Sequence, residues 1–591
     1  MSADKRDFHC VPRAASLVLA TVFGAGLLQL AFRLREVQVD GAADYGYASA
    51  RQSVRRVQVG GTRGRILDRR GIALADNRPS LSVVCHPAVF QKRTWDETVS
   101  AIETAVSNVA RVIGRPSPLS RRSVRRHVNQ ALAMPLTVWR DIGEDELARF
   151  SEQSGEHPGF SVLETEERIY PQGSVAAHLV GTVGRDRGES QAGDEKYNFF
   201  SPELRGRGGI EHYYDSFLRG VSGERKVLVD ARGFAIREWT VSEPRTGPDL
   251  RLTLDLGLQR AAERELLGLR GACAVVNPQN GEVLALASAP GFDPNDFVPV
   301  LRPELYSRYA SDPQKPLLNR AVGGAYAPGS TFKPVVALAA LSTGVPADLT
   351  YECTGVFLLG GMKLHCASRW GHGSLDLRHA LMKSCNPYFC NLGLDVGTNA
   401  LQRAARAFGL GEKTGIDFGV DMAGTVPDAE WKMRMYGEKW FQGDVAQMSI
   451  GQGMLLVSPL QMALVAGAIG TGWRVAPHLK TDIVSERRPL PFSQESLDVV
   501  REGMRLVVAG DGESRGTGWR GGEGVPVSVS GKTGTAEIGL GATRRKNTWF
   551  IAYAPSEAPT VALALVVENG ESGGGTAAPK AAEILKEAFR R

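Results

Sequence analysis

Ser330 and Lys333 have the residue types and the spacing that could carry out covalent chemistry. They lie in the segment APGSTFKP, residues 327–334, ahead of an apolar run that predicts a helix. Residues three apart share one face of a helix, and a lysine amine kept neutral by burial can accept the proton of a serine hydroxyl. The pair therefore predicts a nucleophile and its base. The spacing alone is common, and Ser2 and Lys5 repeat it in the polar N-terminal tail.

A second pair of polar residues, Ser384 and Asn386, follows a stretch over residues 375–383 that predicts a helix. With one residue between them, a hydroxyl and a carboxamide can be directed into one cleft. Taken alone, the pair is as consistent with the turn at the end of a helix. It becomes informative only in combination with the other motifs.

The third motif reads KTGT, and its residues are Lys532, Thr533, Gly534 and Thr535. It comes after an alternating segment, residues 525–529, that predicts a strand. A lysine with two hydroxyls can bind a substrate carboxylate, and the glycine lets another group approach the backbone closely. A second KTG, at residues 413–415, lacks a preceding strand, so we do not expect it to be catalytic.

The three motifs in this order resemble the serine penicillin-recognising superfamily, whose signature is S-x-x-K, S-D-N and K-T-G. Here the middle motif is Ser-Cys-Asn. Other segments resemble class B penicillin-binding proteins, namely RGRILDRRG (63–71), RIYP (168–171), HLVG (178–181), GGIE (208–211) with Tyr214-Asp215, NRA (319–321), GQG (451–453), SPLQ (458–461) and Trp549-Phe550. No glycosyltransferase domain precedes them, which favours class B. GGAY (323–326) and WGHG (370–373) resemble the elongation type, penicillin-binding protein 2, with the division type as the alternative.

The resemblance implies a D,D-transpeptidase that cross-links peptidoglycan stem peptides and is acylated by β-lactams. Ser330 would attack the penultimate carbonyl of a D-Ala-D-Ala end, with Lys333 as the base. Ser384 would help return a proton to the leaving D-alanine, and Asn386 would hold the donor peptide. The backbone N–H groups of Ser330 and Thr535 would form an oxyanion hole. The KTGT residues would bind the terminal carboxylate. This chemistry requires no cofactor.

Two functions of other classes share parts of this motif set. A β-lactamase carries all three motifs but needs an efficient deacylating base, and an anchor with a long N-terminal region would serve no purpose in it. A β-lactam sensor joins the domain to a cytoplasmic signalling region, for which the tail over residues 1–13 leaves no room. Both are therefore less consistent with the sequence than a transpeptidase.

Four of the seven cysteines fall in one short stretch of the chain. Cys353, Cys366 and Cys385 with His372 form a known type of structural zinc ligand set. The spacing is short enough for a loop to gather around one ion. Since Cys385 is the middle residue of the Ser-x-Asn motif, such a site would hold the loop that carries the motif. Some elongation-type relatives hold a metal in this region.

Other arrangements of these cysteines remain open. A Cys353–Cys366 disulfide is the main alternative because the compartment is oxidising, and buried free thiols are the second. His365 and Cys390 are further candidate ligands.

Residues Ala14–Phe32 form an uncharged run of 19 residues near the N-terminus. A helix of this length can cross the hydrocarbon core of a membrane. Lys5, Arg6 and Arg13 precede it, which favours a cytoplasmic N-terminus. The run ends without a small-residue cleavage site, so we expect an uncleaved anchor rather than a signal peptide.

The pattern of elements predicts a multidomain α/β (α+β) protein in three parts. The parts are a tail and transmembrane anchor (1–35), an extended mixed pedestal domain (36–245) and a transpeptidase domain (246–591). The resemblance implies a central antiparallel sheet flanked by helices in the last part. The predicted helices are 96–113, 258–267 and 577–589, and the predicted strands are 249–254, 272–276, 282–286, 548–553 and 561–567, with a tight turn at Asn280-Gly281.

The anchor and the resemblance together predict where the protein acts and with which partners. We expect a single-pass protein of the bacterial inner membrane with its catalytic domain on the periplasmic side. Class B enzymes cannot make glycan strands, so the resemblance implies a SEDS-family polymerase and other elongation-complex membrane proteins as partners. The net charge of +6 is mild and no basic block is interleaved with aromatic residues, so nucleic-acid binding is not expected.

Overall fold

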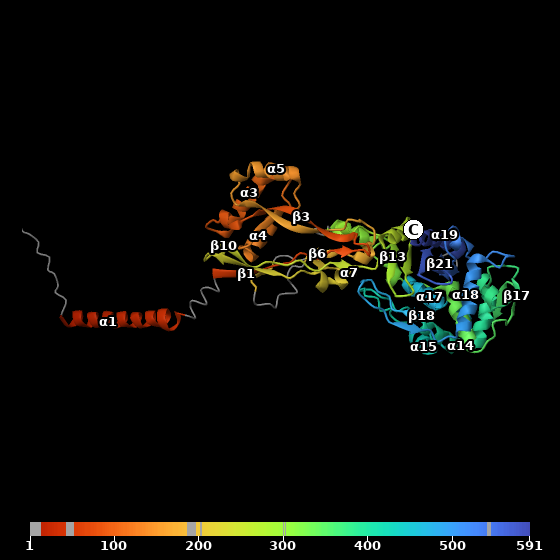
Figure 1. Ribbon diagram of the computed structural model, residues 1–591. Coiled ribbons are helices and arrows are strands. Elements are labelled where there is room, and N and C mark those ends of the chain that lie inside the picture. Colours follow the sequence, from red (N-terminus) through yellow and green to blue (C-terminus); the bar gives the residue numbers. More distant parts are fainter. Residues whose placement is uncertain are drawn as a thin grey trace, which may run out of the picture.

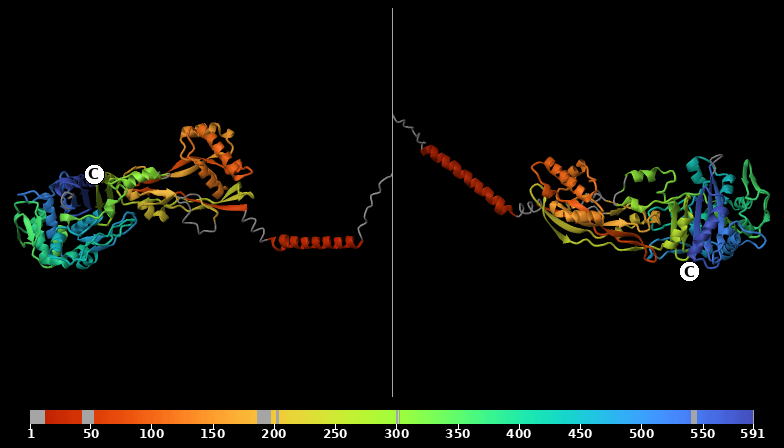
Figure 2. Two further views of the ribbon diagram at one scale, coloured as in Figure 1. Left: turned by 180° about the vertical axis from the view of Figure 1, so that it is seen from behind. Right: turned by 90° about the horizontal axis from the view of Figure 1, so that it is seen from above.

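A computed structural model shows an elongated molecule in which a narrow pedestal leads to a larger domain at the C-terminal end (Figures 1 and 2). The expected N-terminal tail, with Ser2 and Lys5, lies outside the described part of the chain. The described residues are 13–42, 53–185, 197–200, 204–298, 301, 303–539 and 545–590.

Helix α1 (Arg13–Arg35) contains the run that the sequence predicts to be a membrane span. Within the helical stretch Ala14–Asp40, the apolar 18-residue window has a mean hydropathy of 1.9, and none of that window is buried against the rest of the protein. An isolated helix that is apolar on all sides is stable in lipid rather than in water. By length and composition α1 is therefore able to cross a membrane once.

The pedestal is organised around a long two-stranded ribbon. Strand β3 (Ala73–Cys85) pairs antiparallel with β5 (Phe160–Ile169) over ten residue pairs. Helix α3 (Trp95–Ile113) covers one end of the ribbon and confirms the helix predicted at 96–113; Thr94 and Glu97 form its capping box. A second sheet runs beside the ribbon, in the order β10-β9-β1-β7. Its three longer strands are β1 (Val54–Val59), β9 (Gly223–Val229) and β10 (Ala235–Ser242).

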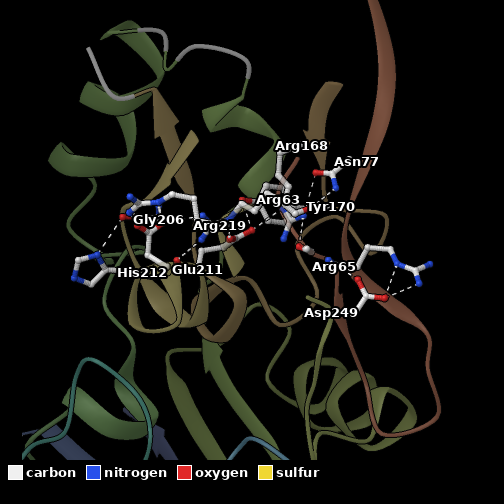
Figure 3. A network of polar contacts seen from close by, with 12 residues as sticks. Arg63, Arg65, Asn77, Arg168, Tyr170, Gly206, Glu211, His212, Arg219 and Asp249 are labelled. Atoms are coloured by element: carbon white, nitrogen blue, oxygen red, sulfur yellow. Dashed lines mark hydrogen bonds and ion pairs between the residues drawn. The ribbon is translucent and has the colours of Figure 1, made fainter. Parts of the chain in front are cut away.

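A buried ionic network joins three of the pedestal motifs, as Figure 3 shows. The Glu211 carboxylate is fully buried and accepts hydrogen bonds from Arg63 Nε at 2.6 Å and Arg168 Nε at 2.8 Å. Arg63 also donates to Asp215 Oδ1 at 2.7 Å, and Arg168 donates to the Gly64 carbonyl at 2.8 Å. Charges buried this deeply are tolerated only when they are paired. The network therefore connects the segment between β1 and β2, which carries Arg63, to strand β5 and to α7 (Gly209–Tyr213).

The C-terminal domain is built on a five-stranded antiparallel sheet in the order β13-β12-β22-β21-β20. Its strands are β12 (Gly271–Val276), β13 (Val283–Ala289), β20 (Ser530–Ile538), β21 (Arg545–Ala554) and β22 (Val561–Glu568). The hairpin predicted around Asn280-Gly281 is confirmed as β12 and β13, with Ala274 opposite Leu286. The sheet is antiparallel, as the resemblance implied.

Helices cover both faces of this sheet. On one face, α9 (Leu256–Glu265) and α19 (Ala578–Ala588) pack Leu258 and Ile584 onto β12 and β22. On the other face, the apolar helix α17 (Pro459–Thr471) separates the sheet from the helices near Ser330. The predicted helices at 258–267 and 577–589 are thus confirmed, and the chain has the expected mixed α/β fold.

Two predicted strands are wrong in position. Only Leu250–Arg251 of the segment 249–254 forms a strand, β11, and it pairs with β2 (Ile66–Leu67) rather than with the C-terminal sheet. The alternation that suggested a strand arises because Leu250, Leu252 and Leu254 are all buried at the junction with the pedestal. The segment 525–529 is not a strand either, since Pro526 has no N–H to donate to a ladder, and pairing begins at Ser530.

Candidate active site

Ser330 lies on a short 3₁₀ turn, Gly329–Phe332, that leads directly into α12 (Lys333–Ser342). The pair is therefore carried on two consecutive turns, not within one regular α-helix as expected. Gly329 has φ +57°, and a Cβ there would lie 3.1 Å from the Thr535 carbonyl. The turn can approach β20 this closely only because residue 329 is glycine. Gly329 N–H also donates to the Gly451 carbonyl at 2.8 Å.

The Lys333 side chain is fully buried at the start of α12. Its Nζ donates to the Ser384 carbonyl and to Asn386 Oδ1, both at 2.7 Å. Burial lowers the pKa of Lys333 to about 8, because the charged amine loses its hydration. Among the described residues, the Ser330 hydroxyl makes no hydrogen bond. Contacts of this kind often tighten only when substrate is bound.

Ser384 occupies the turn between α13 (Leu377–Met382) and α14 (Asn386–Ala407). Its φ is +55°, a conformation that non-glycine residues rarely adopt and that often marks a functional site. The Ser384 hydroxyl accepts a hydrogen bond from Lys532 Nζ at 2.9 Å and lies 3.5 Å from Lys333 Nζ. The hydroxyl is therefore placed between two buried amines and can pass a proton from one side of the site to the other.

Asn386 begins α14 and is held by contacts at both ends of its carboxamide. Its oxygen accepts from Lys333, and its Nδ2 donates to the His365 carbonyl at 2.8 Å. The contact with His365 links the motif to the hairpin formed by β15 (Val356–Leu359) and β16 (Met362–His365).

The KTGT motif lies on β20, the edge strand of the sheet. Lys532 is fully buried, and its pKa is lowered by burial and by the charge of Lys333. The Thr533 hydroxyl contacts the Thr517 hydroxyl at 3.0 Å. A Cβ at Gly534 would lie 2.8 Å from the Thr331 methyl group, which explains the glycine. An edge strand offers unpaired backbone groups to which a peptide substrate can add as a further strand.

A cavity of about 680 Å³ brings the three motifs together. Several of its lining residues were not anticipated from the sequence. Thr517, Gly573 and Lys363 come from segments without a recognisable pattern, so no signal in the sequence identified them. The lining residues that were anticipated as catalytic or substrate-binding are Ser330, Ser384, Asn386, Thr533, Gly534 and Thr535. The second KTG, residues 413–415, lies in a turn where its Thr and Gly bind Asp421, and it does not line this cavity.

The predicted ligands Cys353, Cys366, His372 and Cys385 gather directly beside the Ser-x-Asn turn. Their donor atoms all lie within 4.8 Å of one another. Cys366 Sγ is 3.5 Å from His372 Nδ1 and 4.0 Å from Cys385 Sγ, and tetrahedral Zn–S bonds of about 2.3 Å give sulfur–sulfur separations of about 3.8 Å. The cluster thus has the donor types and the spacing of a tetrahedral metal site.

The structure also shows the bonding state of these cysteines and the position of the further candidate Cys390. All six cysteines of the described chain are free, Cys353 and Cys366 included. Cys390 points away from the cluster and contacts the Ala446 carbonyl. A hydrogen bond from Cys385 and contact with His372 lower the pKa of the Cys366 thiol well below its ordinary value, a state that favours metal binding.

Comparison with known proteins finds two families that together match most of the chain after α1. The family described as "Penicillin binding protein transpeptidase domain" matches residues 271–586, and "Penicillin-binding Protein dimerisation domain" matches residues 58–252. The curated "Peptidoglycan D,D-transpeptidase MrdA" of Acinetobacter baumannii is 31% identical over 95% of this chain and 85% of that protein. The Escherichia coli K12 protein of the same name is 32% identical over 91% of this chain and 88% of that protein.

Solved structures give the same assignment. A penicillin-binding protein 2 from Helicobacter pylori, solved in complex with MreC, has a TM-score of 0.77 at 27% identity and covers 91% of this chain and 99% of that one. A chain of a peptidoglycan synthase complex, whose description concerns polymerization and crosslinking, has a TM-score of 0.72 at 28% identity and covers 98% of this chain and 99% of that one. The chain therefore belongs to the class B penicillin-binding proteins, and it is similar to members of the elongation type, penicillin-binding protein 2.

Proposed function

We propose that the chain is a serine D,D-transpeptidase that cross-links peptidoglycan stem peptides during cell elongation. The observation that carries the proposal is that Ser330 and Ser384 line one cavity, and that the Ser384 hydroxyl lies between the buried amines of Lys333 and Lys532. No cofactor is needed for this chemistry.

In the acylation step, Ser330 Oγ bonds to the penultimate D-alanine carbonyl carbon and the bond to the terminal D-alanine breaks. Neutral Lys333 takes the hydroxyl proton, and the proton reaches the leaving amine through Ser384. The terminal carboxylate binds Lys532 with the hydroxyls of Thr533 and Thr535. The N–H groups of Ser330 and Thr535 stabilise the oxyanion.

In the second step, an amine from a neighbouring stem peptide attacks the ester carbonyl. A new amide bond forms, the Ser330 ester bond breaks, and Ser330 recovers a proton from the attacking amine through Lys333. Penicillin also acylates Ser330, but the reaction ends after this first step because no acceptor amine displaces the bound penicillin.

We also propose the placement and the partners of the protein. The anchor spans residues 1–35, the pedestal 36–245 and the transpeptidase domain 246–591, with the last two on the periplasmic side of the inner membrane. The basic residues before the span and the identity of the relatives support this orientation. Protease added to intact spheroplasts should degrade the pedestal, and full protection of the pedestal would contradict the orientation.

A SEDS-family polymerase is the proposed partner, with other membrane proteins of the elongation complex. The chain should therefore cross-link only where glycan strands are being made. Vesicles that contain the full chain, such a polymerase and lipid II are expected to yield cross-linked muropeptides by mass spectrometry. Ser330→Ala should abolish the cross-links and leave the glycan strands. Strands that stay uncross-linked with the wild-type chain would count against the proposed function.

We propose that the Cys353, Cys366, His372 and Cys385 cluster holds a structural zinc ion. The ion would fix the turn that carries Ser384 and Asn386, because Cys385 lies between them. It takes no part in the bond-forming steps.

Protein purified without added metal or a polyhistidine tag is expected to contain about one zinc ion per chain. His372→Ala should lose the metal and also reduce penicillin labelling, since the turn is no longer held. His365→Ala is the matched control and should keep the metal, because the His365 side chain is not among the four clustered donor groups. A metal-free protein with a mapped Cys353–Cys366 bridge would refute the proposal.

A further inference from the structure

One wall of the active-site cavity carries basic side chains and no acidic ones. The wall consists of the β15–β16 hairpin and the loop that follows it, and its members are Lys363, His365 and Arg369. The other charged lining residues come from β20, β21 and the segment after β22 and have both signs of charge: Glu537, Lys546 and Glu571. The cavity is thus electrostatically asymmetric, and the asymmetry coincides with the side on which Asn386 lies.

The alternation of β16 explains why these side chains face the cavity. Met362 and Leu364 are partly buried and pack against the main hydrophobic core. Successive side chains of a strand point to opposite faces, so Lys363 and His365 share the other face. Both are exposed there. A strand whose one face is anchored in the core cannot slip in register without exposing Met362 and Leu364.

The loop that carries Arg369 is fixed by close backbone contacts. A Cβ at Gly355 would lie 2.4 Å from the Arg369 carbonyl, and a Cβ at Gly371 would lie 2.0 Å from the Cys353 carbonyl. Cys366 N–H donates to the Gly355 carbonyl at 2.9 Å. The loop can pack this closely only because Gly371 within it and Gly355 beside it, just before β15, are glycines with positive φ. Arg369 is therefore presented from a fixed backbone.

Lys363 and Arg369 form no ion pair with another described residue. In the described part of the chain, no carboxylate lies within ion-pair distance of Lys363 or Arg369. Two cations held on the same wall of a cavity without a counter-ion create a local positive potential that attracts an anionic ligand.

We infer that Lys363 and Arg369 bind a carboxylate of the donor stem peptide, upstream of the D-alanine that is acylated. The inference rests on the proposed transpeptidase function and specifies its substrate as an acidic donor. Asn386 holds the donor in that function, and its Nδ2 donates a hydrogen bond to the backbone carbonyl of His365 at the end of β16. Lys363 and His365 line the same cavity as Ser330 and Asn386, so a peptide that leaves Ser330 past Asn386 can run along the hairpin.

The dimensions agree with this path. Lys363 is two residues from His365, about 7 Å along the strand. Two residues of extended chain span about 7 Å, and a γ-linked residue adds two methylene groups, about 2.5 Å, which the long side chains of Lys363 and Arg369 can span. Stem peptides carry such a group as the α-carboxylate of a γ-linked glutamyl residue. The geometry therefore points to recognition of that carboxylate, and to weaker use of donors in which it is amidated.

The test compares two stem pentapeptide donors, one with the glutamyl α-carboxylate free and one with it amidated. Release of D-alanine by the full chain in detergent is measured for each. Lys363→Met with Arg369→Met is expected to lower the rate for the free-carboxylate donor about tenfold and the rate for the amidated donor less than about twofold. Lys363→Arg with Arg369→Lys should retain the preference for the acidic donor.

Two controls separate this inference from the proposed function. Penicillin lacks the upstream carboxylate, so its acylation of Ser330 should stay within about twofold in the double variant. The exposed residue Lys413, outside the cavity, gives a matched control as Lys413→Met. Equal rates of the wild-type chain with both donors, or equal losses with both in the double variant, would overturn the inference and leave the function standing. A wild-type chain that releases D-alanine from neither donor would contradict the function itself and, with it, the inference.

Discussion

Lys333→Met is expected to slow the acylation of Ser330 by penicillin by about 10²–10⁴-fold, the usual contribution of a positioned general base. Lys333 begins the helix that directly follows the turn of the nucleophile, and burial has already brought the pKa of its amine to about 8. Methionine keeps most of the volume of the side chain, so the fold should be retained. The measurement is the second-order rate of fluorescent penicillin labelling.

The pH dependence of the same reaction separates a base from a structural role. Only the neutral amine accepts a proton, so below its pKa the rate should rise about tenfold per pH unit and level off above about pH 8. In Lys333→Met this rise should disappear. Lys413→Met, at the exposed second KTG, should retain both the rate and the profile. An unchanged rate or an unchanged profile in Lys333→Met would rule out the assigned role.

Glu211→Ala is expected to destabilise the pedestal by about 3–5 kcal/mol, because it leaves the buried guanidinium groups of Arg63 and Arg168 without their shared carboxylate. Glu211→Gln keeps the shape and loses the charge, so its effect should be intermediate. Hydrogen exchange of pedestal peptides, followed by mass spectrometry, measures the free energy of local opening.

Asp249→Ala is the matched control, since Asp249 pairs with Arg65 beside the same network (Figure 3) but the two side chains are 38% and 50% exposed. An exposed pair contributes at most about 1 kcal/mol. Penicillin labelling of Ser330 should survive in both variants, because the site lies in the other domain. A Glu211→Ala protein as stable as the Asp249→Ala protein would show that the network does not hold the pedestal together.

The sequence predicted those parts of the fold whose signals are local. Asn280-Gly281 between two apolar runs identified the β12–β13 hairpin, and the uncharged run identified α1. The strand before KTGT was misplaced because alternation cannot show that Pro526 interrupts a ladder, whereas the partner strand β21 decides where pairing begins.

Long-range pairings were beyond the sequence alone. Arg63, Arg168, Glu211 and Asp215 were noticed as motif residues, but each reads as an ordinary surface charge until the fold brings them together. The basic wall was missed for the same reason: Lys363 lies in a segment without a motif, and only the hairpin register turns it toward the cavity.

The central claim is that Ser330 is the nucleophile, and peptide mapping of the penicillin adduct tests it most directly. The full-length wild-type chain should gain the mass of one penicillin molecule, located on the peptide that contains Ser330. The Ser330→Ala protein should gain none under the same conditions. An adduct on another residue such as Ser384, or equal labelling of the Ser330→Ala protein, would contradict the account.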